Sequence, residues 1–189
     1  EKCVSETQIP LNGLPLGGYW NHVNINSQIF NVTQSDTLDL VYFYGSGNCL
    51  NNDTTNLVIN PLPIVDPGID FESCIDDADE LLVPSVLGGT WSGNGITDPN
   101  GTFTPSTAGV GVHNLNYFFR DTNTCEITVP LQATVYALPI VLTQVDTVIC
   151  DLPVDVALNA SPSGGNWIDS NITNNGIYSP DGTGTFKIY

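Results

Sequence analysis

Five cysteines offer the clearest chemistry in this sequence, because thiols pair into disulfides in an oxidising compartment. Cys3, Cys74 and Cys150 each lie 17 residues before a tryptophan, whereas Cys49 and Cys125 follow the first two of them by 46 and 51 residues. This alternation predicts one bond within each stretch of chain, Cys3–Cys49 and Cys74–Cys125. Cys150 is then left over, and truncation of a third stretch explains it better than a reactive thiol does.

A run of carboxylates from residue 66 to residue 80 could bind Ca²⁺, a hard cation that takes about six to eight oxygen ligands. The candidate ligands are Asp66, Asp70, Glu72, Asp76, Asp77 and Asp79. No Asp-x-Asp-x-Asp-Gly loop is present, and the stretch around Cys150 carries fewer acidic residues. Two interpretations stay open, a calcium site and a solvated acidic surface, and no other cofactor is expected.

Catalytic chemistry has little support in the sequence. The two histidines are His22 and His113, and neither a His-Glu-x-x-His nor a Gly-x-Ser-x-Gly motif occurs. His113 shares its parity with Leu115 and Tyr117, which predicts a partly buried structural side chain. The cysteines are assigned to bridges or to truncation, so no nucleophile remains. We therefore expect a protein that is not an enzyme.

Composition excludes two further classes. The chain has 189 residues, 20 acidic against 3 basic, and a formal net charge of −17, whereas a nucleic-acid groove binder needs a basic face. No apolar run is long enough to cross a membrane, and no signal peptide is expected at Glu1. Apolar residues make up 41% of the chain, which is enough for packed cores. Few basic residues, five cysteines and no methionine favour an extracellular protein.

Three copies of a Gly-Gly-x-Trp element indicate internal repetition. Their tryptophans are Trp20, Trp91 and Trp167. A leucine lies 9 residues before each tryptophan, an isoleucine 5 residues after it, and an aromatic residue 10 to 12 residues after it. We predict three repeats, at residues 1–66, 67–141 and 142–189, the last one truncated. The stretches 62–65 and 138–141, each with a central proline, are predicted to be short stiff connectors that pack against domain ends.

Apolar residues alternate with polar ones, which predicts half-buried strands over residues 38–44, 115–119 and 127–135. Helix should be almost absent, and the Asn/Gly/Asp/Pro clusters between strands are typical of turns. The predicted fold is all-β, with tandem antiparallel sandwiches held by one internal disulfide each. Each tryptophan is expected to be a core pin beside that bond. A sugar-stacking platform is the alternative role for these indoles.

The second predicted repeat carries the fullest motif: Gly88-Gly89-Thr90-Trp91-Ser92-Gly93-Asn94-Gly95-Ile96, then Gly101-Thr102-Phe103-Thr104-Pro105, Ala108-Gly109-Val110-Gly111, Leu115-Asn116-Tyr117 and Cys125. This pattern resembles the immunoglobulin-like repeats of giant Bacteroidota cell-surface adhesins of the gliding-motility type. The resemblance implies immunoglobulin-like sandwiches, export by the type 9 secretion system, and display on the outer membrane, at the cell surface, for attachment or gliding. It also implies O-glycosylation of Asp-Ser/Thr-apolar tripeptides, with Thr37, Thr54 and Thr147 as candidates.

The function expected from these observations is a non-catalytic stalk segment of a secreted surface adhesin, which spaces and presents an adhesive region. Its partners would be neighbouring repeats, secretion components during export, and a surface or polysaccharide bound through other regions, with no nucleic acid and no membrane insertion. The alternatives are a carbohydrate-binding module, with or without Ca²⁺, and an accessory repeat of a secreted hydrolase.

Overall fold

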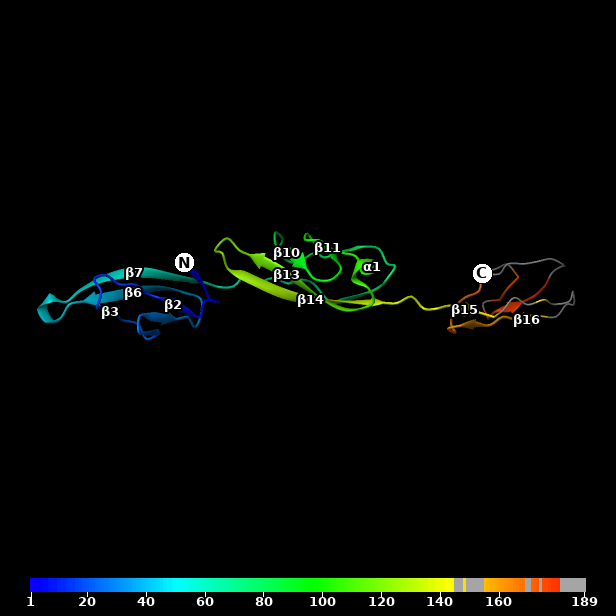
Figure 1. Cartoon of the computed structure of the whole chain (residues 1–189), viewed down its shortest axis with the longest axis horizontal. Coiled ribbons are helices and arrows are strands. Elements are labelled where there is room, and N and C mark those ends of the chain that lie inside the picture. Colours follow the sequence, from blue (N-terminus) through cyan, green and yellow to red (C-terminus); the bar gives the residue numbers. More distant parts are fainter. Residues whose placement is uncertain (145–147, 149–154, 169–170, 174, 181–189) are drawn as a thin grey trace. The chain divides into compact units, whose positions relative to one another are not determined.

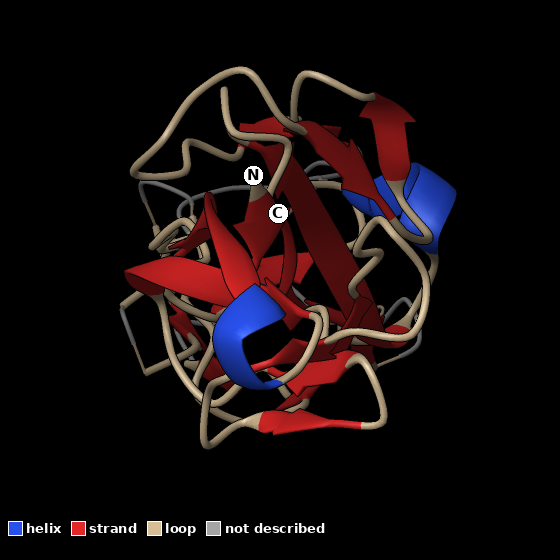
Figure 2. Ribbon diagram, turned by 90° about the vertical axis from the view of Figure 1, so that its left-hand side faces the viewer, coloured by secondary structure: helices blue, strands red, loops and turns tan. Residues whose placement is uncertain are grey.

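The computed structural model describes residues 1–144, 148, 155–168, 171–173 and 175–180. It divides the chain into two units, Glu1–Tyr136 and Ala137–Tyr189, which are described separately. The prediction of an all-β fold is confirmed: strands form most of the secondary structure, and helix in the described residues is limited to η1 (Gly47–Cys49) and α1 (Pro105–Ala108) (Figures 1 and 2). In the described part of the chain, no helix has the length and apolarity needed to cross a membrane.

Residues 1–66, here called segment I, contain seven strands in two sheets. A four-stranded sheet has the order β1-β7-β6-β3, and a three-stranded sheet has the order β2-β5-β4. The strands are β1 (Lys2–Cys3), β2 (Gln8–Pro10), β3 (Tyr19–Trp20), β4 (Ile25–Asn26), β5 (Ile29–Asn31), β6 (Asp36–Tyr44) and β7 (Asn51–Asn60). The β6–β7 hairpin is the longest pairing in this segment.

Residues 67–136, here called segment II, also contain seven strands. They are β8 (Phe71–Cys74), β9 (Glu80–Leu81), β10 (Thr90–Ser92), β11 (Ile96–Asp98), β12 (Thr102–Phe103), β13 (Gly111–Arg120) and β14 (Glu126–Tyr136). The sheets have the orders β10-β13-β14-β8 and β11-β12-β9. When strands are matched in chain order, these are the same two sheets as in segment I.

Most pairings are antiparallel, as predicted, but one in each segment is parallel. β1 runs parallel to β7, with Cys3 opposite Asn60, and β8 runs parallel to β14, with Cys74 opposite Tyr136. No strand ladder joins segment I to segment II, although both lie in the unit Glu1–Tyr136. The three-repeat division at residues 66 and 141 stays a prediction.

The repeat landmarks make one hydrogen bond that recurs three times. The N–H groups of Leu11, Leu82 and Leu158 donate to the carbonyls of Gln28, Gly101 and Gly176, at 2.8, 2.9 and 2.8 Å. All three acceptor residues have positive φ, at 67°, 118° and 74°. In the second unit the described strands are β15 (Leu142–Thr143), β16 (Val156–Ala157), β17 (Ala160–Ser161) and β18 (Ile177–Tyr178). The β16–β18 pairing there corresponds to the β2–β5 and β9–β12 pairings.

Each segment of the first unit has its own apolar core between its two sheets. In segment I the buried cluster consists of Ile9, Phe30, Leu40 and Ile59. In segment II it consists of Leu82, Trp91, Phe103, Ala108, Leu115, Tyr117, Leu131, Ala133 and Val135, together with Val65 from the end of segment I. The buried members on the long strands have alternating positions, as the sequence pattern predicts. β8 pairs with β14 only from Ala133 onward. Pro130 therefore lies in the part of β14 that pairs with β13 alone, where the missing N–H of a proline is tolerated.

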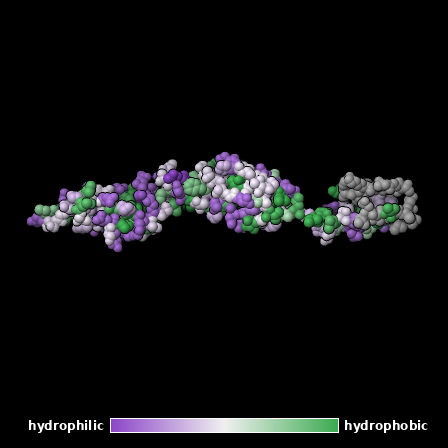
Figure 3. Space-filling model, viewed as in Figure 1, coloured by the Kyte–Doolittle hydropathy of each residue, from purple (hydrophilic) through white to green (hydrophobic). Residues whose placement is uncertain are grey.

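The two predicted connectors, residues 62–65 and 138–141, differ in the burial of their apolar side chains. In the first, Val65 is buried in the core of segment II, while Ile64 is exposed. In the second, Leu138, Ile140 and Val141 are exposed, and Figure 3 shows apolar atoms along the chain that follows β14. The prediction of apolar packing therefore holds for Val65, and it stays a prediction for the second connector.

Candidate functional site

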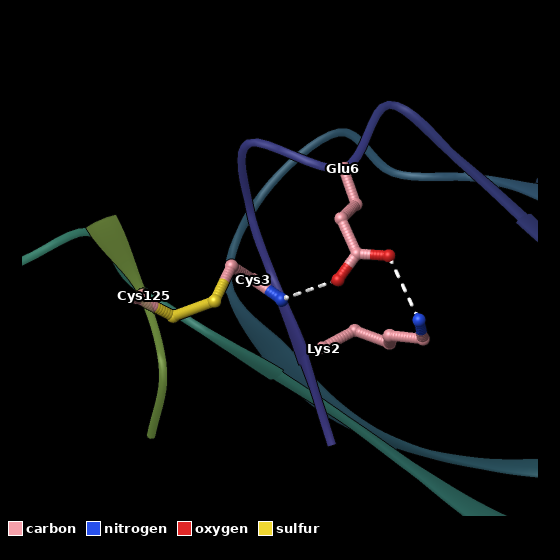
Figure 4. A network of polar contacts seen from close by, with 4 residues as sticks. All are labelled: Lys2, Cys3, Glu6 and Cys125. Carbon is pink, nitrogen blue, oxygen red and sulfur yellow. Dashed lines mark hydrogen bonds and ion pairs between the residues drawn. A yellow bond between two sulfur atoms is a disulfide. The ribbon is translucent and has the colours of Figure 1, made fainter. Parts of the chain in front are cut away.

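The structure contains a disulfide between the two segments. Cys3, at the end of β1, is bonded to Cys125, which directly precedes β14, with a Cα–Cα distance of 5.5 Å (Figure 4). Both residues are buried, although they lie 122 positions apart in the sequence. The bond therefore links segment I covalently to segment II.

The predicted pairing of Cys3 with Cys49 and of Cys74 with Cys125 is wrong, and strand length explains why. Cys3 lies opposite Asn60, the last residue of β7, whereas Cys49 precedes the first residue of that strand. Ten residues of strand cover about 33 Å, and a disulfide requires Cα atoms within about 7 Å. In segment II, Cys74 and Cys125 lie in the same way at opposite ends of the 11-residue β14.

Polar groups surround the bonded cysteines on both sides. The Cys3 N–H donates to Glu6 Oε1 (3.4 Å), and Lys2 Nζ forms an ion pair with Glu6 Oε2 (2.9 Å) (Figure 4). The hydrogen bond from Lys2 holds the pKa of Glu6 below its usual value. The two side chains are 42% and 41% exposed, so solvent screens the pair and its contribution to stability is below about 1 kcal/mol. The Cys125 N–H donates to Asp121 Oδ1 (2.8 Å), which fixes the start of β14.

The other two described cysteines are free thiols. Cys49 is exposed in η1, at the tip of the β6–β7 hairpin, and Cys74 is partly buried at the end of β8. Cys150 lies outside the described residues.

Trp20 and Trp91 pack against tyrosines and not against the disulfide, so the predicted pin beside the bond is corrected. Trp91 is buried against Tyr117, with ring centroids 5.1 Å apart, and the partly buried Trp20 lies 5.0 Å from Tyr42. Neither core cluster includes a bonded cysteine. Trp167 is partly buried in the second unit, where its indole lies beside Gly176. Their role as core side chains is retained for Trp91 and Trp20.

The same tyrosines clamp the Gly-Gly loop, a role that the sequence reasoning missed. Tyr117 Oη accepts from the Gly89 N–H (2.8 Å) and donates to the carbonyl of Val86 (2.7 Å). In segment I, Tyr42 Oη accepts from the Gly18 N–H (2.8 Å) and donates to the carbonyl of Pro15 (2.7 Å).

The clamp explains the second glycine of the first two Gly-Gly pairs, Gly18 and Gly89. A Cβ on Gly89 would overlap the carbonyl oxygen of Phe118 and the ring of Tyr117, and Gly18 is packed against Phe43 and Tyr42 in the same way. The Leu-x-Tyr sequences ending at Tyr42 and Tyr117 are the signal that could have indicated this contact.

Replacing Tyr117 with phenylalanine should destabilise segment II by about 1–3 kcal/mol, because the Gly89 N–H and the Val86 carbonyl lose their partner while the ring stays in place. Urea unfolding followed by circular dichroism measures the change. Tyr44→Phe is the matched control, since Tyr44 is exposed on β6. Equal effects of the two variants would contradict the clamp.

The structure does not bring the six predicted calcium ligands into one group. Asp76 and Asp77 lie with Cys74, their ligand atoms within 4.8 Å of one another, and Asp77 Oδ2 accepts from the Cys74 N–H (2.6 Å). Three other predicted ligands accept separate hydrogen bonds. Asp66 accepts from the Gly68 N–H, Asp70 from the Gln132 N–H, and Glu72 from the Tyr136 hydroxyl. Asp79 is exposed and outside the group. The hydrogen bond to Glu72 raises the pKa of Tyr136 above its usual value.

A solvated acidic surface predicts that added Ca²⁺ leaves the melting temperature of the full chain unchanged. Two neighbouring carboxylates and a thiol are fewer oxygens than Ca²⁺ takes. The measurement is thermal unfolding with Ca²⁺ or with a chelator, and Mg²⁺ at equal ionic strength serves as the control. A rise specific to Ca²⁺ that is lost in Asp76→Asn/Asp77→Asn would identify the site instead.

Thr37 and Thr54 occupy equivalent surroundings on the β6–β7 hairpin. Each is exposed, and its backbone N–H donates to the carboxylate of the preceding aspartate, at Asp36 Oδ1 (2.7 Å) or Asp53 Oδ1 (2.9 Å). Thr147 lies outside the described residues. Glycosylation at these positions stays a prediction.

The two histidines have local structural contacts. His22 packs against Phe30, with ring centroids 5.3 Å apart, and its Nδ1 accepts from the Asn24 N–H (3.1 Å). His113 is partly buried, and its Nε2 lies 2.8 Å from the carbonyl of Gly109. A hollow of about 210 Å³ lies beside His22, Asn24 and Asp36. These contacts match the structural role predicted for His113.

Comparison with known proteins adds no relative: no protein family and no curated protein matches this chain.

Proposed function

We propose that this chain is a non-catalytic stalk segment of a secreted bacterial surface adhesin, built from tandem immunoglobulin-like repeats. The observation that carries the proposal is the Cys3–Cys125 bond between two segments of identical strand order. A bond between consecutive domains limits their separation, as a load-bearing spacer requires. Presentation of an adhesive region for attachment or gliding is the task that the sequence resemblance adds.

The immunoglobulin-like assignment is supported by topology. Such domains contain about seven strands in two sheets, with a buried tryptophan on the third strand. Each segment has seven strands in a four-plus-three arrangement, and Trp20 and Trp91 lie on the third strand of their segments. The parallel pairing of first and last strands recurs in both segments.

An extracellular location is supported by the disulfide, because such bonds persist in oxidising environments. The net charge of −17 keeps a repeat array soluble and opposes lateral sticking between chains. Export through the type 9 secretion system and attachment at the outer membrane are proposed from the sequence resemblance alone.

The bond defines how the segments carry force. Tension applied between Glu1 and Ala137 passes from Cys3 through the sulfur atoms to Cys125 and along β14, which is already extended. The residues between the two cysteines are bypassed. Segment I and most of segment II therefore cannot lengthen while the bond is intact.

Single-molecule stretching of the full chain tests this role. Under oxidising conditions we expect no extension from the residues between Cys3 and Cys125. Reduction should release up to roughly 440 Å, since the bond spans 122 residues at about 3.3–3.6 Å each. Cys3→Ser under oxidising conditions should behave like the reduced protein. Equal extension of the oxidised and reduced wild type would overturn the proposal.

The carbohydrate-binding alternative gains no support from the hollow beside His22. Its volume of about 210 Å³ is below the roughly 300–1,000 Å³ of small-molecule sites. A spacer predicts that the purified chain gives no signal above background on a glycan array. Saturable binding to one glycan class would favour the alternative.

Glycosylation of Thr37 and Thr54 is proposed as a modification of the exposed hairpin. Intact-mass measurement on protein from the native source should show added mass, which Thr37→Val/Thr54→Val reduces. Only the unmodified mass would contradict the proposal.

A further inference from the structure

Cys74 lies at the position in segment II that corresponds to Cys3 in segment I, and Cys49 lies at the position in segment I that corresponds to Cys125 in segment II. Cys3 and Cys125 are bonded to each other, whereas Cys49 and Cys74 are free thiols. Cys74 has the backbone surroundings of Cys3: each lies opposite the last residue of the parallel strand, Tyr136 or Asn60. The following residue, Ile75 or Val4, donates its N–H to the carbonyl of that strand residue at 2.9 Å.

The turn after each strand cysteine is also shared. The carbonyl of the cysteine accepts from the N–H three residues later, at 2.9 Å from Glu6 and 3.1 Å from Asp77. The carboxylates of these same two residues accept from the cysteine N–H. Cys74 is therefore held in the same frame that presents Cys3 to its partner.

Cys49 and Cys125 are related in the same way. Tyr42 lies opposite Asp53 and Tyr117 lies opposite Val129, and each cysteine precedes that opposite residue by four positions. Both cysteines belong to the hairpin that joins the last two strands of the segment. Cys125 is buried under Cys3, whereas Cys49 is exposed.

Neither free thiol can reach the hairpin or strand cysteine of its own segment. The last strand separates the two positions by about 33 Å in segment I and about 36 Å in segment II. A strand cysteine therefore needs a partner outside its own segment, and Cys3 finds this partner in the hairpin cysteine Cys125.

We propose that Cys49 of one chain and Cys74 of a second copy form a disulfide of the Cys3–Cys125 kind, which joins repeats of different copies head to tail. This rests on the proposed function, because it extends the bonded-repeat arrangement beyond one chain. The two thiols transfer their protons and two electrons to a small-molecule disulfide, such as oxidised glutathione, which leaves as two thiols. One protein S–S bond forms as the glutathione S–S bond breaks.

The local charges allow this approach. Residues 45–52 around Cys49 carry no charged side chain, whereas Asp76 and Asp77 lie beside Cys74. A neutral hairpin therefore meets an acidic strand end without direct repulsion. The opposing effect is the net charge of −17 on each copy, which salt screens.

The test uses the full chain with Cys150→Ser, which removes the thiol outside the described residues. The protein is incubated with oxidised glutathione in about 1 M sodium chloride, where the Debye length is about 3 Å. Non-reducing electrophoresis and peptide mass spectrometry then identify the products. We expect dimers and longer covalent oligomers that contain a Cys49–Cys74 cross-linked peptide, because each copy carries one thiol of each kind.

Cys49→Ser and Cys74→Ser, each added to Cys150→Ser, should abolish the oligomers. Thiols that carry only glutathione, or oligomers joined through Cys49–Cys49, would overturn the proposal. The Cys3–Cys125 peptide in the same digest reports the proposed function separately. Its presence without the Cys49–Cys74 link refutes this inference alone, and its absence refutes both.

Discussion

Replacing both Cys3 and Cys125 with serine should lower the free energy of complete unfolding of Glu1–Tyr136 by up to about 5 kcal/mol. The bond closes a loop of 122 positions in the unfolded chain, and loop-closure entropy for that length corresponds to about 5 kcal/mol. The two segments share no strand ladder, so loss of the bond should also separate their unfolding into two transitions.

Urea unfolding of the variant and of wild type, with and without a reducing agent, measures this effect. Reduced wild type should match the variant. Cys49→Ser and Cys74→Ser are the matched controls, because they remove free thiols and should leave stability unchanged. If Cys49→Ser destabilised the oxidised protein as much as the double variant does, the observed pairing would be contradicted.

Replacing Trp91 with alanine should destabilise segment II by about 3–5 kcal/mol, the usual cost of truncating a buried large aromatic side chain. Trp91 is 3% exposed and packs between Tyr117 and the backbone at Gly101, where a Cβ would lie 2.9 Å from the indole. The loss should appear in the unfolding transition that includes segment II.

Calorimetric unfolding of Trp91→Ala alongside Phe118→Ala tests this expectation. Phe118 lies next to Tyr117 on β13 but on the opposite face, where it is 38% exposed, so its truncation should cost far less. Trp20→Ala should have an intermediate effect because Trp20 is only partly buried. Similar losses for Trp91→Ala and Phe118→Ala would contradict the assigned core.

The sequence predicted the elements that depend on local pattern. Alternation around Leu40, Leu115 and Leu131 identified the long strands, because a half-buried strand places every second residue in the core. The spacing of Leu11, Leu82 and Leu158 predicted that these leucines are repeat landmarks, and in the structure their N–H groups make the same hydrogen bond. These features require only information from nearby residues.

The disulfide could not be predicted in the same way, because it depends on strand pairing between distant residues. Cysteine spacing suggested closure within a repeat, but the parallel β1–β7 and β8–β14 pairings place Cys3 and Cys74 at the far ends of the last strands. The six predicted calcium ligands do not lie close together for a related reason. Asp70 and Glu72 bond to residues on β14 that lie more than 60 positions away.

Peptide mapping of the native protein, digested under non-reducing conditions with free thiols blocked, tests the central claim most directly. A covalent bond between consecutive segments predicts a cross-linked peptide containing Cys3 and Cys125, with Cys49 and Cys74 not joined to either of them. Cross-linked peptides joining Cys3 to Cys49 and Cys74 to Cys125 would contradict the claim.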